Sequence, residues 1–128
     1  SPYELFGKER YMAPEYSWLN IGKNYKTIFL NEALSVVEYQ DEGISRNNLS
    51  HRVSSPVSTA RFYFIAWSVS DNISNSMRSA LNYTRFCFHG KVPSKLPFSM
   101  RLLLAIPGWL FYCRDLISLK MKSGKLKL

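Results

Sequence analysis

The first segment with apolar residues at helical spacing lies close to the start of the chain. Its apolar side chains at helical spacing are Trp18, Ile21 and Tyr25. Pro14 suits the first turn of a helix, where its missing N–H costs nothing, and Glu15 in the same turn is favoured by the helix dipole. The pattern therefore predicts a helix that buries its Trp18, Ile21 and Tyr25 face and ends close to residue 24.

The pattern then changes to that of strands. Residues 28–30 and 34–39 are rich in β-branched and aromatic side chains, and the short polar segment 31–33 between them suits a turn. These features predict a β-hairpin from Ile28 to Tyr39. A long polar loop follows, and such a loop in a compact domain usually binds something or moves.

The second half of the chain has helical patterns only. We expect helices in the four segments 56–69, 75–88, 98–106 and 109–128. The first is apolar on nearly every side, which is typical of a helix that is buried all round or lies on another hydrophobic surface. Asn75 or Ser76 is expected to cap the second segment. Pro107 and Gly108 are expected to interrupt the helix between the last two segments.

Together these elements predict an α+β fold that is mostly α-helical, with one helix, one β-hairpin and then three to four helices. We divide the chain into the helix, hairpin and loop at 1–55, a helical packing region at 56–90 and a basic amphipathic tail at 91–128. The basic character belongs to the tail. Of the net charge of +8, residues 1–90 carry nine Lys and Arg against eight Asp and Glu, whereas the tail carries eight against Asp115 alone. This asymmetry predicts an anionic partner surface, the alternative being a solvated face.

The tail also contains a run of twelve residues from Leu102 to Cys113 with few polar side chains. A spanning helix needs roughly 20 apolar residues, so the run is predicted to lie in a membrane interface rather than cross it. The residues expected to contact the membrane are Trp109, Phe111, Tyr112, Lys120 and Lys122. The alternative is an ordinary C-terminal core helix. The aromatic block is separate from the terminal lysines, which argues against a nucleic-acid groove.

Cys87 and Cys113 form no disulfide framework or zinc motif, which suits a reducing compartment. The sequence has no secretory signal pattern and no initiating Met, so we expect a piece of a longer cytoplasmic chain. His51 and His89 have no acidic or Cys neighbours at ligand spacing and are expected to be structural. The single best candidate for chemistry is Glu15, since a carboxylate beside aromatic residues can deprotonate a hydroxyl. The alternative is a glutamate that only satisfies the helix dipole.

An ordered series of elements adds weight to Glu15. It comprises Glu15, Trp18, Lys23 with Tyr25, the expected hairpin, and the Tyr39-Gln40-Asp41-Glu42-Gly43-Ile44-Ser45 loop. Residues 52–56, 82–86 and 107–115 then supply Arg-x-x-x-Pro, Asn-Tyr-x-Arg-Phe and Pro-Gly to Arg-Asp elements. In this order and spacing they resemble the C-terminal half of bacterial family 2 glycosyltransferases with the A-type nucleotide-sugar fold. The resemblance covers nearly the whole chain.

The resemblance implies inverting transfer of a sugar from a nucleoside diphosphate donor to an acceptor hydroxyl in cell-surface polysaccharide synthesis. Glu15 matches the position of the catalytic base, and Tyr16 and Trp18 are then expected to line the acceptor side. The loop residues expected to contact substrate are Asp41, Gly43 and Ser45. Lipid-linked sugars are among the acceptors that this family implies, which suits a location at the cytoplasmic face of the cell membrane.

The family's nucleotide-binding half precedes this region and is absent from the sequence. That half carries the Asp-x-Asp that holds Mg²⁺ or Mn²⁺ on the diphosphate, so we expect no cofactor in this chain and a metal only together with that half. Without those groups nothing neutralises the leaving diphosphate. The sequence therefore predicts an acceptor-side fragment that is inactive alone. The alternative is a non-catalytic module that docks on an anionic membrane or a partner protein.

Overall fold

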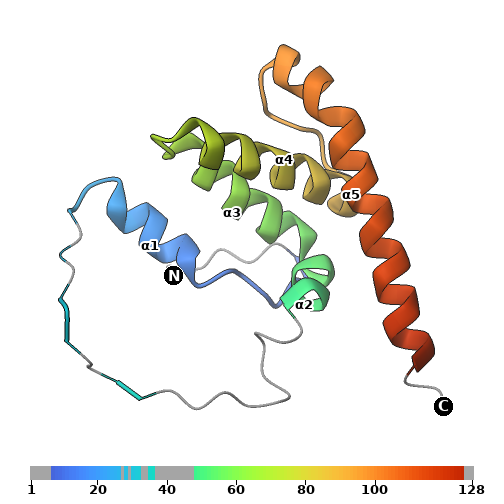
Figure 1. Cartoon of the computed structure of the whole chain (residues 1–128), viewed down its shortest axis with the longest axis horizontal. Helices are drawn as coiled ribbons and strands as arrows, with labels where there is room; N and C mark the ends of the chain where they lie inside the picture. The colour runs from blue at the N-terminus through green and yellow to red at the C-terminus, as the bar shows by residue number, and fades with distance from the viewer. Residues whose placement is uncertain (1–6, 27, 29, 33–34, 37–47, 126–128) are drawn as a thin grey trace.

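The computed structural model describes residues 7–26, 28, 30–32, 35–36 and 48–125. Five helices occupy this part of the chain: α1 (Glu15–Gly22), α2 (Asn48–Ser54), α3 (Pro56–Ser68), α4 (Ile73–Gly90) and α5 (Phe98–Lys125). Helices α3 and α4 lie side by side, α1 and α2 contact α3, and the long α5 packs across α4 (Figure 1).

The predicted α+β fold is wrong, because the described residues form helices and contain no strand. The described positions of the expected hairpin, from Ile28 to Val36, are exposed, and the Ile28 side chain is 84% accessible. The rest of that hairpin lies outside the described residues. A two-stranded hairpin is marginal in water unless it packs on a further strand or helix, and the described helices offer these residues no such surface.

Helix α1 begins at Glu15 as predicted, but its predicted buried face is wrong. Trp18 is 71% exposed, and Ile21 and Tyr25 are also exposed. The side chain that α1 buries is Tyr16. The helix has only eight residues, so it presents one anchor to α3 instead of a long apolar face.

The core lies between α3 and α4. Ala60 on α3 and Ala80 on α4 are both buried, and their small side chains let the helices approach. Aromatic rings fill the space beside them: Tyr63 stacks on Phe86 with ring centroids 5.7 Å apart. The apolar character of α3 on nearly every side is explained because α1, α2 and α4 all contact it.

The N-cap of helix α4 lies three or four residues earlier than expected. It is Asn72, whose Oδ1 accepts a hydrogen bond of 2.8 Å from the Ser74 N–H. The cap expected at Asn75 or Ser76 is therefore wrong. An asparagine side chain at this position satisfies one of the free N–H groups of the first turn.

Helix α5 runs without a break through Pro107 and Gly108, so the predicted interruption is wrong. Pro107 has no N–H for the bond to the Leu103 carbonyl, which weakens the helix locally. Packing on α4 offsets this loss at Gly108, where a Cβ atom would lie only 2.8 Å from Thr84 Cγ2. The resulting helix has 28 residues and is about 42 Å long.

Because α5 is continuous, its length must be compared again with the thickness of a membrane. Phe98–Gly124 is the segment of the described chain that is long and apolar enough to cross a bilayer by length and composition. The twelve-residue run considered in the sequence is only the middle of this helix. Length therefore no longer distinguishes a spanning helix from an interfacial one, and the surroundings of α5 must decide.

Candidate functional site

Glu15 and Tyr16 point in different directions at the start of α1. Tyr16 is buried against α3, where the Arg61 guanidinium carbon lies 5.9 Å from its ring centroid. The Glu15 side chain is exposed, and no hydrogen bond or ion pair to another described residue holds its carboxylate. The buried tyrosine thus fixes the helix start, while the neighbouring carboxylate remains accessible from solvent.

The segment before α1 is tied to the start of α3. The Glu9 carboxylate accepts hydrogen bonds from the N–H groups of Val57 and Ser58, at 2.8 and 2.7 Å. Ser55 Oγ accepts further bonds from the N–H groups of Arg10 and Tyr11, at 3.3 and 3.1 Å. A carboxylate at a helix N-terminus satisfies free N–H groups and complements the helix dipole. These contacts span more than 40 residues of sequence and hold Glu15 next to α3.

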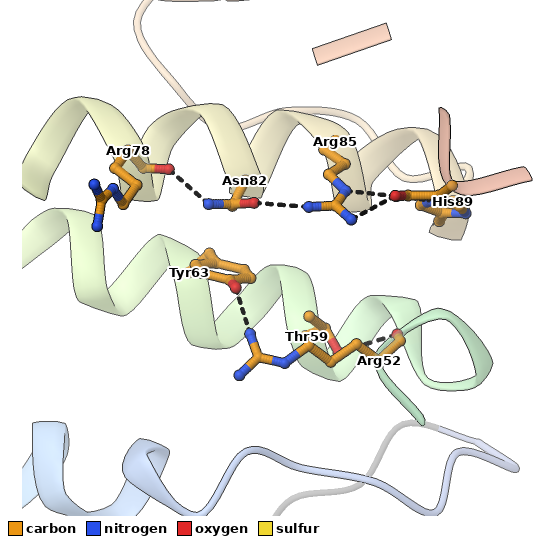
Figure 2. A network of polar contacts seen from close by, with 8 residues as sticks. Arg52, Thr59, Tyr63, Arg78, Asn82, Arg85 and His89 are labelled. Carbon is orange, nitrogen blue, oxygen red and sulfur yellow. Dashed lines mark hydrogen bonds and ion pairs between the residues drawn. The ribbon is translucent and has the colours of Figure 1, made fainter. Parts of the chain in front are cut away.

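Arg52 of α2 and Tyr63 of α3 form a polar contact (Figure 2). The guanidinium of Arg52 donates to the Tyr63 hydroxyl and also to Asn48 Oδ1 at 2.7 Å. Burial raises the pKa of Tyr63, while the charges of Arg52 and Arg85 act in the opposite direction and Glu15 adds a smaller raising effect. Glu15 acts on the Tyr63 hydroxyl through its charge alone, since no hydrogen bond or ion pair between described residues joins it to Arg52 or Tyr63. We call Glu15, Arg52 and Tyr63 the junction site.

Sequence reasoning found Arg52 only as part of the Arg-x-x-x-Pro element and did not single out Tyr63. His51 stacks on Tyr11, with ring centroids 5.9 Å apart, which agrees with the structural role expected for it. Of the other expected substrate-contact residues, Trp18 lies exposed on the outer side of α1. Asp41, Gly43 and Ser45 lie outside the described residues.

A second polar network joins α4 to α5 (Figure 2). Arg85 donates to both carboxylate oxygens of Asp115, at 2.5 and 2.6 Å, and His89 Nε2 lies 3.0 Å from Asp115 Oδ2. Asn82 Oδ1 accepts a further bond of 3.1 Å from Arg85. The network thus brings together the Asn-Tyr-x-Arg-Phe and Arg-Asp elements. Asp115 is only 1% exposed, and its contacts hold α5 against α4.

The outer face of α5 carries a row of exposed apolar side chains. We call this row the apolar stripe; its members are Leu102, Ile106, Trp109, Leu110, Ile117 and Met121. The opposite face holds the buried residues Leu104, Gly108 and Asp115 and packs on α4. The stripe therefore extends along most of α5, and no described residue covers it.

The five expected membrane-contact residues divide between these two faces. Trp109 belongs to the stripe, and Lys120 and Lys122 are exposed near the end of α5. Phe111 is half-buried beneath the Arg114 guanidinium, 4.6 Å from its ring centroid. Tyr112 packs edge-on against His89 with centroids 4.7 Å apart. The structure thus places Phe111 and Tyr112 toward α4 rather than on the outer surface.

Among the described residues, no group of three or more His, Cys, Asp and Glu side chains could hold a metal ion. Comparisons of the chain with models of protein families, with curated proteins and with solved structures give no match. The resemblance to family 2 glycosyltransferases therefore stays a prediction from the sequence elements. The functional argument rests on the junction site and on the surface of α5.

Proposed function

We propose that this chain is the C-terminal, acceptor-side part of an inverting glycosyltransferase in which Glu15 is the general base. The observation that carries the proposal is the accessible Glu15 carboxylate in the first turn of a helix that Tyr16 anchors. A general base must reach its proton from a fixed position, and the Glu9 and Ser55 contacts supply that fixed position.

In this reaction an acceptor hydroxyl attacks the anomeric carbon of a nucleoside diphosphate sugar. The new bond forms between the hydroxyl oxygen and that carbon, and the bond from the carbon to the diphosphate oxygen breaks. The diphosphate leaves with the electron pair, and Glu15 takes the hydroxyl proton. Groups that bind the nucleotide and neutralise the diphosphate, including Mg²⁺ or Mn²⁺, belong to a nucleotide-binding half outside this sequence.

The test compares this chain alone with the whole product of the gene that encodes it. Both are incubated with nucleoside diphosphate sugars, and release of the nucleoside diphosphate and transfer of labelled sugar are measured. We expect transfer from the whole product and none from this chain alone. Transfer by this chain alone, or a gene that encodes no nucleotide-binding half, would contradict the proposal.

A second function, binding to an anionic membrane surface, is favoured by the apolar stripe of α5. Tryptophan and aliphatic side chains on one face of a helix suit the boundary between headgroups and acyl chains, and each nearby lysine adds about 1 kcal/mol on an anionic surface. Lys120 and Lys122 are exposed and fit that role. This function is compatible with transfer to a lipid-linked acceptor.

The contacts of α5 favour an orientation along the membrane surface over one that crosses it. Asp115 lies in the second half of α5 and pairs with Arg85 and His89 of α4. If α5 crossed a bilayer with this packing intact, these charged side chains of α4 would enter the hydrocarbon with it, at a cost of several kcal/mol. An α5 that lies flat keeps the network on the protein side and the stripe on the lipid side.

The test is flotation with vesicles that contain phosphatidylserine. The double variant Ile106→Ser/Ile117→Ser removes two apolar side chains from the stripe. Each buried isoleucine contributes about 1.5–3 kcal/mol, so we expect binding to weaken by at least about tenfold. The matched control, Ile21→Ser/Ile28→Ser, changes two exposed isoleucines outside α5. Equal binding by the two double variants, or equal binding of the wild type to phosphatidylcholine vesicles, would contradict this function.

A further inference from the structure

A cavity of about 540 Å³ lies between the end of α4, the linker that follows it and the first turns of α5. Pockets that bind small molecules usually have volumes of about 300–1,000 Å³. The cavity is far from the junction site in sequence: it involves residues 84–105, and none of its lining residues belongs to α1, α2 or α3. It is therefore a feature that neither proposed function uses.

The wall of the cavity is largely apolar. It is formed by Cys87 and Phe88 of α4, Val92 and Pro93 of the linker and Ala105 of α5. Burial raises the pKa of the Cys87 thiol, so this side chain is neutral at physiological pH and adds no charge to the wall. Such a surface favours a hydrocarbon group over a fully polar ligand.

Two cations, Lys91 and Arg101, and two hydroxyl side chains, Thr84 and Ser94, also line the cavity. None of the lining residues is acidic. Neither cation forms an ion pair with another described residue, although the Arg101 guanidinium carbon lies 5.6 Å from the Phe98 ring centroid. The two cations are therefore available to an anion, and a guanidinium fits the paired oxygens of a phosphate particularly well.

The linker that forms one wall is held in a defined conformation. Lys91 adopts a left-handed backbone with φ of 51° and ends α4, and the Val92 N–H donates to the Cys87 carbonyl at 3.1 Å. Further along, the Lys95 N–H donates to the Tyr83 hydroxyl at 2.9 Å, and Leu96 is buried. A non-glycine residue in the left-handed region is uncommon and persists where its surroundings hold it. The cavity wall is thus formed before any ligand binds.

We infer that this cavity binds a lipid phosphate, with the phosphate on Lys91 and Arg101 and the adjoining hydrocarbon on the apolar wall. Arg101 and Ala105 line the cavity, while their neighbours Leu102 and Ile106 belong to the apolar stripe. The same two turns of α5 therefore serve a lipid surface and a phosphate site, as basic pockets between helices do for lipid headgroups.

The test uses the full chain and dihexanoyl phosphatidic acid below its micelle concentration, so that no membrane is required. Binding is followed by isothermal titration calorimetry. We expect saturable binding that Lys91→Gln/Arg101→Gln weakens by about tenfold for each of the two cations removed. The matched control, Lys120→Gln/Lys122→Gln, removes the same charge from the far end of α5 and is expected to leave the affinity within about twofold. Circular dichroism checks that both variants remain helical.

Three further measurements separate lipid phosphate from other ligands. Ala105→Leu narrows the cavity at its apolar wall without changing its charge and is expected to weaken binding. Inorganic phosphate and dihexanoyl phosphatidylcholine, which carries no net charge, are expected to bind at least about tenfold more weakly. Equal affinity for either compound would overturn the inference, as would equal effects of the two double charge variants.

This inference does not depend on the proposed transferase. Glu15→Gln is expected to leave the binding of dihexanoyl phosphatidic acid unchanged, because Glu15 lies outside the cavity. The stripe variant Ile117→Ser, which does not line the cavity, is also expected to bind the soluble lipid normally. Failure of lipid binding and failure of sugar transfer are therefore observed separately.

Discussion

Asp115 on α5 receives two hydrogen bonds from the guanidinium of Arg85 on α4, 2.5 and 2.6 Å long, in a site where Asp115 is 1% exposed. A two-point contact between a planar guanidinium and a carboxylate fixes distance and orientation together. It therefore sets the register in which α5 lies on α4. The register decides which face of α5 is covered and leaves the apolar stripe on the outer side.

Loss of this pair should be costly. Asp115→Asn leaves the half-buried Arg85 without its full counter-charge, and we expect the free energy of unfolding to fall by about 3–5 kcal/mol. Urea denaturation followed by circular dichroism measures the change. Asp71→Asn, at an exposed position, is the matched control and should change stability by less than about 0.5 kcal/mol.

A double variant separates the charge from the packing. Arg85→Met/Asp115→Leu replaces the pair with apolar side chains, and a buried ion pair replaced in this way is often neutral. We expect the double variant to be more stable than Asp115→Asn. A double variant that is less stable than Asp115→Asn would show that the ion pair itself stabilises the protein.

The contact between Gly108 and Thr84 leads to a second prediction. Gly108→Ala adds a Cβ atom 2.8 Å from Thr84 Cγ2 and 3.2 Å from Thr84 Cβ, so α5 must move away from α4. We expect a loss of about 1–3 kcal/mol in the free energy of unfolding. Thr84→Ser in the same protein removes Cγ2 and keeps the hydroxyl that donates to the Ala80 carbonyl, so it should restore part of the loss.

Gly124→Ala is the control for helix propensity, because nothing lies within 4 Å of the added Cβ. It should stabilise the helix by up to about 1 kcal/mol. If Gly108→Ala raises the free energy of unfolding as Gly124→Ala does, the result would contradict the close contact between α4 and α5 at Thr84.

Stability should decrease in alkaline solution. Burial raises the pKa of Cys87 from 9.0 and those of Tyr63 and Tyr83 from 10.0 in the folded chain. Below these ordinary values both states keep their protons, so the stabilising contribution is complete. At higher pH the unfolded chain loses these protons first, and the free energy of unfolding falls as pH rises.

The measurement is urea denaturation at pH 7.5 and at pH 10. Cys87→Ala removes one of the three groups and should reduce the difference between the two pH values. The half-buried Cys113 provides the control substitution. A difference that Cys87→Ala leaves unchanged would exclude the thiol as a contributor.

The carboxylate of Glu9 supports a fourth prediction. Glu9→Ala leaves the N–H groups of Val57 and Ser58 without their acceptor and should cost about 0.5–2 kcal/mol, as other N-cap losses do. Because Glu9 also ties the segment before α1 to α3, hydrogen exchange at Tyr16 should increase as well. Glu32→Ala, an exposed carboxylate outside the helices, should change neither quantity.

The sequence predicted helices over most of residues 56–128, but it predicted a loop where α2 (Asn48–Ser54) lies and a break at Pro107 and Gly108. It predicted the start of α1 from Pro14 and Glu15, whose positions depend on local chemistry alone. It failed where tertiary contacts decide the result. Pro107 stays inside α5 because Gly108 packs on Thr84, and no local pattern contains that contact.

Tertiary contacts also explain why the sequence did not predict the exposure of Trp18 and the pairing of polar side chains. Trp18 was expected to be buried because it recurs at helical spacing with Ile21 and Tyr25, yet an eight-residue helix with one anchor leaves it exposed. The pairing of Arg85 with Asp115 joins residues 30 apart in sequence, and the Arg52 contact with Tyr63 depends on how α2 meets α3. The spacing of these residues along the sequence does not predict that they pair.

The most direct test of the central claim is the turnover number for sugar transfer by the whole gene product with Glu15→Gln. The variant keeps the size of the side chain and removes its ability to accept a proton. We predict a fall of about 10²–10⁴-fold in kcat, with donor binding unchanged and with Glu32→Gln close to the wild type. A Glu15→Gln protein that transfers sugar at the wild-type rate would contradict the assignment of Glu15 as the base.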